Sequence, residues 1–393
     1  MILFELVEKL KVGKFYFYLR ISSFCFILLF FNLIGAQDLS LDLGELMDGK
    51  YDPNRLEAIR SMRNDQYYTV LEEDKTSNTN SLVSYAYSNA LERKVLIDSN
   101  KFPEKNKFSG YIFSNDEQKI LLETLTDNIY RRSKQAIYWI YDIKTNSLEK
   151  LFDQKVQEPL FSPDGSKVAY VYRRNLFIKN LELDIVKQIT YDGDYQTING
   201  ITDWVYEEEF GFVRAFDWSQ DSNQIVYMRF DESNVPIFSM DVYGNQTYPF
   251  PYMFRYPKAG EENSKIELII YNTSSQTKET IDFENETPYY IPRIQFIGGR
   301  HSLIIQTLNR HQNKLKLWRW NTKKKNLQLL LTEIDEAYVS INDDLKFIED
   351  DGFLWTSEKD GYRHIYHFDK DGKLINQVTQ GDWEVTTIYN YNP

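Results

Sequence analysis

Cysteine, histidine and phosphate-binding loops are scarce in this sequence, and their scarcity excludes several kinds of site. The 393 residues contain one cysteine and four histidines. The cysteine, Cys25, lies in an apolar run near the N-terminus. Because it is the single cysteine of the chain, no internal disulfide can form. Neither a His-Glu-x-x-His spacing nor a glycine-rich phosphate loop occurs. The sequence therefore predicts no metal and no cofactor.

Basic residues are also outnumbered. Asp and Glu total 58 against 46 Lys and Arg, which gives a formal net charge of −12, and no long basic run follows the N-terminal segment. Because proteins bind nucleic acids by neutralising phosphates with Lys and Arg, we predict no nucleic-acid partner. What the chain does have is 42% hydrophobic and 16% aromatic residues, enough for a large core and typical of strands.

The N-terminus has the features of an export signal. Four basic residues, the last of them Arg20, precede an apolar run over residues 21–34, and Gly35 and Ala36 offer a cleavage site. The run is shorter than the roughly 20 residues of a membrane span. We predict a signal peptide at 1–36 and an exported protein of a bacterial periplasm or cell envelope, or a secreted one. A retained signal anchor is the alternative.

After a predicted lead-in at residues 37–65, with a small helix or turn, the pattern changes to short alternating strands. These strands are rich in β-branched and aromatic residues and are separated by Asn, Asp, Gly and Ser turns. No long amphipathic helix interrupts them. The fold class is therefore predicted to be all-β, with clear strands at Val83–Tyr87, Val168–Tyr172, Ile225–Met228, Leu303–Ile305 and Leu315–Trp318.

A repeat underlies these strands, in which an aromatic residue is followed by a polar turn and a hydrophobic strand. The aromatic residues are separated by about 48, 57, 78 and 51 residues, the spacing of four-stranded antiparallel β-propeller blades. A jelly roll or sandwich is the alternative, but neither explains such a spacing. The five copies begin at Phe113, Phe161, Trp218, Phe296 and Phe347, and in the second copy Pro163 and Gly165 suit a tight turn.

One acidic stretch stands out, Asp203-Trp204-Val205-Tyr206-Glu207-Glu208-Glu209. Three adjacent carboxylates beside two large aromatic residues do not suit a half-buried strand, because neighbouring side chains point to opposite faces and like charges repel. Carboxylates that converge on one cavity would attract a cation, such as a lysine, a metal ion or the free ammonium of a peptide. A solvated acidic turn or a helix start is the alternative.

The same stretch carries a resemblance to a known family. Residues 199–209, Asn-Gly-Ile-Thr-Asp-Trp-Val-Tyr-Glu-Glu-Glu, resemble the glutamate motif of the dipeptidyl peptidase IV family, serine exopeptidases related to prolyl oligopeptidase. Three further segments resemble family segments in the same order, at Tyr256–Gly260, Gly361–Ile365 and Gly381–Val385. The resemblance covers nearly everything after the predicted signal peptide.

The resemblance implies an eight-bladed propeller that caps an α/β-hydrolase domain, with the active site between them. It implies that Glu208 and Glu209 hold the N-terminal ammonium of a peptide substrate, and that Arg131 binds the carbonyl of the second substrate residue. Arg132 is the close alternative to Arg131. Two carboxylates that hold an ammonium would set the distance to the bond that is cut, as an exopeptidase requires. Phe210 and Phe212 would line the same cavity or belong to the core.

The sequence also departs from the family pattern. No Gly-x-Ser-x-Gly nucleophile elbow occurs in it. We therefore expect residues 66–393 to form a truncated propeller, about six blades and part of the next, without the C-terminal α/β-hydrolase domain. The segment from Tyr338 to Asp350 is shorter and more acidic than the family's loop. His364 and His367 lie on a predicted strand, on opposite faces, so they predict no metal site.

The predicted function is substrate recognition in a secreted dipeptidyl peptidase that removes Xaa-Pro and Xaa-Ala dipeptides. The catalytic Ser, Asp and His would belong to the full-length parent, and this chain alone is predicted to be inactive. The expected partners are peptides with a free N-terminus, the hydrolase domain and, for the full-length protein, a second copy in a homodimer. The alternatives are a stand-alone propeller that binds peptides or proteins and a non-functional remnant.

Overall fold

The computed structural model describes residues 41–53, 58–74, 76–103, 106–283, 286–297, 301–348 and 352–391. The predicted signal peptide at 1–36 lies outside these residues. The chain divides into two compact units, Met1–Glu57 and Ala58–Pro393. In the first unit, helix α2 (Leu43–Met47) begins after Asp42, whose carboxylate accepts a hydrogen bond from the Glu45 N–H at 3.0 Å. No helix in the described ranges is long and apolar enough to cross a bilayer.

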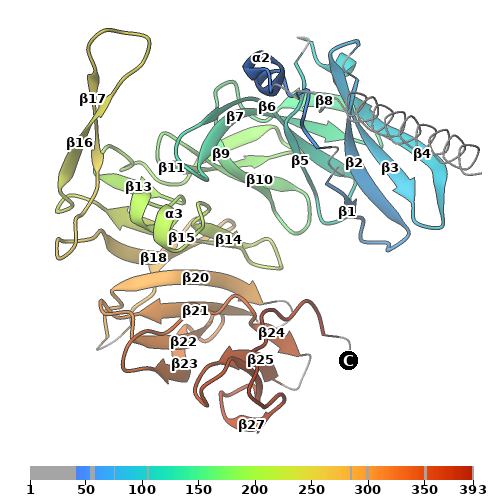
Figure 1. Ribbon diagram of the computed structural model, residues 1–393. Helices are drawn as coiled ribbons and strands as arrows, with labels where there is room; N and C mark the ends of the chain where they lie inside the picture. The colour runs from blue at the N-terminus through green and yellow to red at the C-terminus, as the bar shows by residue number, and fades with distance from the viewer. Residues whose placement is uncertain are drawn as a thin grey trace, which may run out of the picture. The chain divides into compact units, whose positions relative to one another are not determined.

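The described residues of the second unit form six antiparallel sheets of four or five strands, which follow one another along the chain, and one separate two-stranded sheet (Figure 1). The first contains β1 (Arg60–Ser61), β2 (Tyr67–Asp74), β3 (Thr79–Ala86) and β4 (Asn89–Asp98), followed by the short 3₁₀ helix η1 (Ser99–Lys101). The second contains β5 (Gly110–Phe113), β6 (Lys119–Asn128), β7 (Lys134–Asp142) and β8 (Ser147–Lys150). The third contains β9 (Gln157–Phe161), β10 (Lys167–Tyr172), β11 (Asn175–Asn180) and β12 (Ile185–Gln188).

The fourth sheet is larger and contains the segments that matter for the site. Its strands are β13 (Thr197–Asn199), β14 (Phe216–Trp218), β15 (Gln224–Asp231), β18 (Lys265–Asn272) and β19 (Lys278–Thr280). Helix α3 (Trp204–Glu209) lies between β13 and β14, and a separate hairpin of β16 (Ile237–Val242) and β17 (Phe250–Arg255) lies between β15 and β18.

The last two sheets complete the succession. The fifth contains β20 (Tyr290–Ile297), β21 (Ser302–Leu308), β22 (Lys314–Asn321) and β23 (Asn326–Ile334), and the sixth contains β24 (Lys346–Ile348), β25 (Gly352–Ser357), β26 (His364–Phe368) and β27 (Leu374–Gln377). The all-β prediction is confirmed, with successive four-stranded antiparallel sheets in the manner of propeller blades. The five strands predicted by name all lie within or largely within observed strands.

The predicted repeat corresponds to the first hairpin of five sheets. Its aromatic residues lie at or near the ends of β5, β9, β14, β20 and β24. In the first three copies the next residue is a serine whose hydroxyl donates to an aspartate two residues later, each time at 2.6 Å. The residue after that aspartate has a positive φ, at Glu117, Gly165 and Ser222. The repeat is thus a turn with a fixed hydrogen-bond pattern, which explains why it is visible in the sequence.

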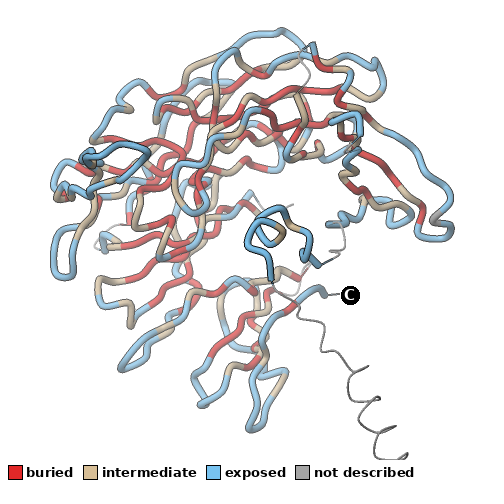
Figure 2. Tube along the Cα trace, turned by 45° about the horizontal axis from the view of Figure 1, so that its top comes forward, coloured by how far each residue is buried: buried red, intermediate tan, exposed pale blue. Residues whose placement is uncertain are grey.

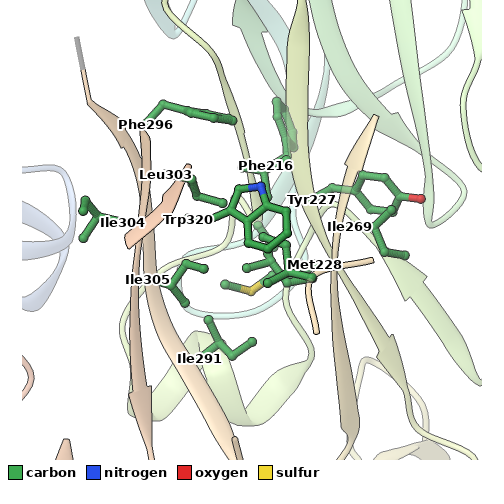
Figure 3. Close-up of a cluster of buried hydrophobic side chains, with 14 of the residues drawn as sticks. Phe216, Tyr227, Met228, Ile269, Ile291, Phe296, Leu303, Ile304, Ile305 and Trp320 are labelled. Atoms are coloured by element: carbon green, nitrogen blue, oxygen red, sulfur yellow. The ribbon is translucent and has the colours of Figure 1, made fainter. Parts of the chain in front are cut away.

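Neighbouring sheets are held together by buried apolar side chains. Between the fourth and fifth sheets, Phe216 and Met228 face Leu303 and Ile305, and Trp320 lies among them (Figure 3). Each fully buried side chain of this kind contributes about 1.5–3 kcal/mol. Buried residues concentrate on the strands, whereas the connecting loops are largely exposed (Figure 2). The core thus leaves the loops exposed, whereas helix α3 is partly embedded in it through Tyr206.

Candidate functional site

Helix α3 contains the acidic stretch, and its start is fixed by Asp203. The Asp203 carboxylate accepts the Tyr206 N–H at 2.9 Å, which caps the helix, and the Ser264 hydroxyl at 2.5 Å. Asp203 is buried, and burial raises the pKa of its carboxyl although these two hydrogen bonds oppose the rise. This carboxyl group is therefore a structural part of the helix.

Tyr206 anchors the middle of α3 in the core. Its ring is buried and makes edge contacts with Phe210 and Phe230, at centroid distances of 4.7 and 5.0 Å. Its hydroxyl accepts the Ile291 N–H of β20 at 2.8 Å. Burial raises the pKa of Tyr206 well above its usual value, so the phenol remains protonated. These contacts hold the helix between the fourth and fifth sheets.

Two arginines satisfy carbonyl groups at the C-terminal end of α3. Arg293 Nη1 donates to the Phe210 carbonyl at 2.9 Å, and Arg132 Nε donates to the Glu207 carbonyl at 3.3 Å. Arg293 also makes a two-pronged ion pair with Asp343, at 2.6 and 3.0 Å. Both ends of this six-residue helix are therefore held by long-range contacts, since a helix so short is not stable alone.

The three glutamates of the stretch have different environments, because adjacent helical residues point in different directions. Glu207 is buried, with 2% of its surface exposed. The Glu208 side chain is 17% exposed, and Glu209 is exposed. Glu209 has no hydrogen-bond or ion-pair partner among the described residues. Along α3 the carboxylates thus change from buried at Glu207 to partly buried at Glu208 and exposed at Glu209.

Arg131 lies beside Glu208. Its Nε is 2.9 Å from Glu208 Oε2, and its side chain is 72% exposed. Arg132, the alternative, instead contacts the backbone at the end of α3 and lies beside Gly211. The structure therefore brings Glu208 and Arg131 together, places Glu209 next to them on the helix, and directs Arg132 elsewhere.

A cavity of about 220 Å³ borders Glu209. Phe210 also lines this cavity, and it belongs to the core as well. Phe212 does not line it and packs under the Arg293 guanidinium at 5.4 Å from the ring centroid. The other residues that border the cavity are Trp204, Val205, Tyr256, Pro257, Lys258, Ala259, Asn263, Tyr290, Arg310 and Gln312.

A larger cavity, of about 400 Å³, lies on another side of α3 and reaches the base of the β16–β17 hairpin. Tyr130, Trp204 and Phe254 are among its aromatic walls. Glu232 also borders it and pairs with Arg174 Nη1 at 3.1 Å. Burial and the nearby Asp203 charge raise the pKa of Glu232 to about 7, against the opposing effects of Arg174 and Arg255.

Sequence patterns do not indicate several residues that shape the site. Ser264 and Arg293 hold the ends of α3 from positions more than 50 residues away in the chain, and Asp343 in turn pairs with Arg293, so no local pattern relates these residues to the helix. The short acidic loop that departs from the family pattern has a structural use. Asp343 pairs with Arg293, and the buried Asp344 pairs with Arg363 at 2.6 Å.

The histidines of β26 lie as the strand pattern predicts. His364 is buried, with its ring nitrogens 3.1 Å from Thr379 Oγ1 and 2.9 Å from the Gly381 carbonyl oxygen, and His367 is half-buried on the opposite face. In the part of the chain that the structure describes, no group of three or more His, Cys, Asp or Glu side chains is arranged to hold a metal ion.

Comparisons with known proteins show which family and fold the chain shares. Residues 114–393 match the family described as the dipeptidyl peptidase IV (DPP IV) N-terminal region. The crystal structure of dipeptidyl peptidase 4 from Porphyromonas gingivalis superimposes with a TM-score of 0.81 and 36% sequence identity, covering 90% of this chain and 51% of that one.

Curated relatives give the same assignment. The probable dipeptidyl-aminopeptidase B of Emericella nidulans is 30% identical over 305 residues, which cover 69% of this chain and 33% of that protein. The prolyl endopeptidase FAP of Mus musculus is 29% identical over 324 residues, which cover 77% and 42%. This chain thus spans between a third and a half of the length of these relatives. It belongs to the dipeptidyl peptidase IV N-terminal region family.

Proposed function

We propose that this chain is the substrate-recognising propeller of an exported serine dipeptidyl peptidase, which removes Xaa-Pro and Xaa-Ala dipeptides from peptide N-termini. The observation that carries the proposal is the placement of Arg131 against Glu208, with Glu209 next to it and without a partner among the described residues. Family membership supports a peptidase parent. The signal peptide at 1–36 and a homodimer of the full-length protein remain parts of the proposal.

In this proposal the two carboxylates bind the ammonium group of the substrate. A primary ammonium has three N–H donors, and two carboxylates in one place can accept them in charge-assisted hydrogen bonds. The Arg131 guanidinium presents further donors on the same side, which suit the carbonyl group of the second substrate residue. The first two residues would then have a fixed position, which limits cleavage to the bond directly after them.

The chemistry of cleavage would come from an α/β-hydrolase domain. The 393 residues contain no Gly-x-Ser-x-Gly elbow, so the Ser, Asp and His would lie in the full-length parent. The same recognition site supports a second candidate, a propeller that binds peptide N-termini without cutting them. Both candidates require the same recognition site, and they differ only in whether the bound peptide is cleaved.

Charge-neutralising substitutions test the recognition site directly. We expect Glu208→Gln and Glu209→Gln each to weaken binding of a Gly-Pro peptide to the chain about tenfold or more, since a charge-assisted hydrogen bond is worth about 1.5–3 kcal/mol. Glu149→Gln, on exposed β8, is the matched control and should bind like the parent chain. Affinities come from isothermal titration calorimetry. Equal affinities of all four proteins would contradict the proposal.

A further inference from the structure

Glu207 is the buried member of the acidic stretch, and it makes contacts that neither of its neighbours makes. Its Oε1 accepts the backbone N–H of Arg132 at 2.6 Å and the N–H of Ser133 at 2.8 Å. Hydrogen bonds from two successive amides to one carboxylate oxygen are short and charge-assisted. Glu207 borders the larger cavity, but it is only 2% exposed and its Oε1 is already taken by these two amides, so its contacts are with the protein.

The two amides belong to the turn between β6 and β7, which also contains Arg131. The turn is closed by the Ile129 N–H, which donates to the Ser133 carbonyl at 2.8 Å, and by the Tyr130 N–H, which donates to the Ser133 hydroxyl at 3.2 Å. Glu207 attaches this turn to α3 directly after Arg131. The direction in which the Arg131 side chain leaves the backbone is therefore set by Glu207.

Such attachment matters because Arg131 has little else to hold it. Its side chain is 72% exposed, and an exposed ion pair such as that with Glu208 gives little net stabilisation for a long, flexible side chain. Arg132, in contrast, is bonded through Nε to the Glu207 carbonyl. One glutamate thus fixes Arg132 along the helix and leaves Arg131 facing Glu208.

We propose that Glu207 is a positioning residue for recognition of the substrate N-terminus, acting through Arg131. The proposal rests on the proposed function, because it assigns Glu207 a part in the same site. Glu207 does not touch the ligand. It fixes the backbone amides of residues 132 and 133, so that Arg131 is presented beside Glu208 before the peptide arrives, which lowers the cost of ordering on binding.

A double-mutant cycle on the full chain tests this inference. The affinity for a Gly-Pro peptide is measured by calorimetry for the parent, Glu207→Ala, Arg131→Ala and the double variant. We expect each single change to weaken binding about tenfold. In the Arg131→Ala background, Glu207→Ala should weaken peptide binding by less than about a further twofold, because its effect passes through Arg131. Glu207→Gln should stay within about threefold of the parent, since its amide oxygen can still accept both N–H groups.

Several results would overturn the inference. Independent, multiplicative losses in the double variant would show that Glu207 does not act through Arg131. A lowered melting temperature with unchanged affinity would make its role purely structural. If Glu207→Ala does not fold, Glu207→Asp replaces it, because the shorter side chain keeps the charge but cannot reach both amides. The affinity of Glu207→Asp for the peptide should match that of Arg131→Ala. An affinity like that of the parent chain would refute the inference. If the parent chain does not bind the peptide, or if Glu208→Gln binds it equally well, the proposed function itself fails.

Discussion

Glu232 allows a quantitative prediction about pH. This carboxyl borders the larger cavity, its side chain is 5% exposed, and its pKa rises from 4.5 to about 7. Because one pKa unit corresponds to about 1.4 kcal/mol, this rise corresponds to about 3 kcal/mol. The folded-state pKa is the higher one. The contribution of the Glu232 carboxyl to the free energy of unfolding is therefore fully present below pH 4.5 and is lost as the pH rises through about 7.

The substitution Glu232→Gln isolates this effect, because the amide has nearly the same shape and does not titrate. Integration of the linkage relation between about pH 5.5 and about pH 8.5 gives a loss of about 2 kcal/mol for the parent that the variant does not suffer. The variant should therefore gain stability relative to the parent by that amount as the pH rises. The partner, Arg174, is left with a hydrogen bond from Nη1 to the Asp194 carbonyl and is partly exposed, so its loss of a counter-charge costs little.

Urea unfolding of the parent and Glu232→Gln, at several pH values over this range, measures the difference. Asp164→Asn is the matched control. Burial raises the pKa of Asp164, but hydrogen bonds from Ser162 and Ser166 have the larger combined effect and lower this pKa to about 2. The pKa values of Asp164 in the unfolded and folded states both lie below this pH range. The difference in the free energy of unfolding between Asp164→Asn and the parent should therefore stay constant across it. A Glu232→Gln difference that is constant, or that changes in the opposite direction, would refute the reasoning.

Two further predictions concern stability. Asp203→Ala removes the cap of α3 and leaves the buried Ser264 hydroxyl without its acceptor. The variant should therefore lose about 3 kcal/mol of unfolding free energy, measured by urea unfolding. A loss below about 0.5 kcal/mol would contradict the role of Asp203. Gly352 has a φ of +106°, and a Cβ there would lie 1.9 Å from the Phe368 carbonyl oxygen. Gly352→Ala should therefore cost about 3 kcal/mol or more, whereas Gly244→Ala, with open space around it, should unfold like the parent.

Local patterns explain what could be predicted of the fold. The copy that begins at Phe161 is visible in the sequence because its serine, proline, aspartate and glycine each serve one turn, and the turn recurs in successive sheets. The strands are visible because alternation of apolar and polar residues is a property of neighbours in the chain. How strongly each sheet packs on the next was not predictable, since those contacts join residues distant in sequence.

The site was only partly visible for the same reason. Three adjacent glutamates indicate a cation-binding site, but nothing in the sequence distinguishes the buried Glu207 from the exposed Glu209 two residues later. That difference depends on the turn before β7, which supplies two amides to Glu207 from 74 and 75 residues away. The choice between Arg131 and Arg132 depends on the same turn. Long-range hydrogen bonds therefore decide the details that sequence patterns leave open.

The most direct test of the recognition site compares two peptides on one protein. A Gly-Pro peptide with a free N-terminus and the same peptide with an acetylated N-terminus differ only in the ammonium group that Glu208 and Glu209 are proposed to bind. We expect acetylation to weaken binding to the chain about a hundredfold, as expected for the loss of about 3 kcal/mol of charge-assisted hydrogen bonding. Equal affinities for the two peptides would contradict it.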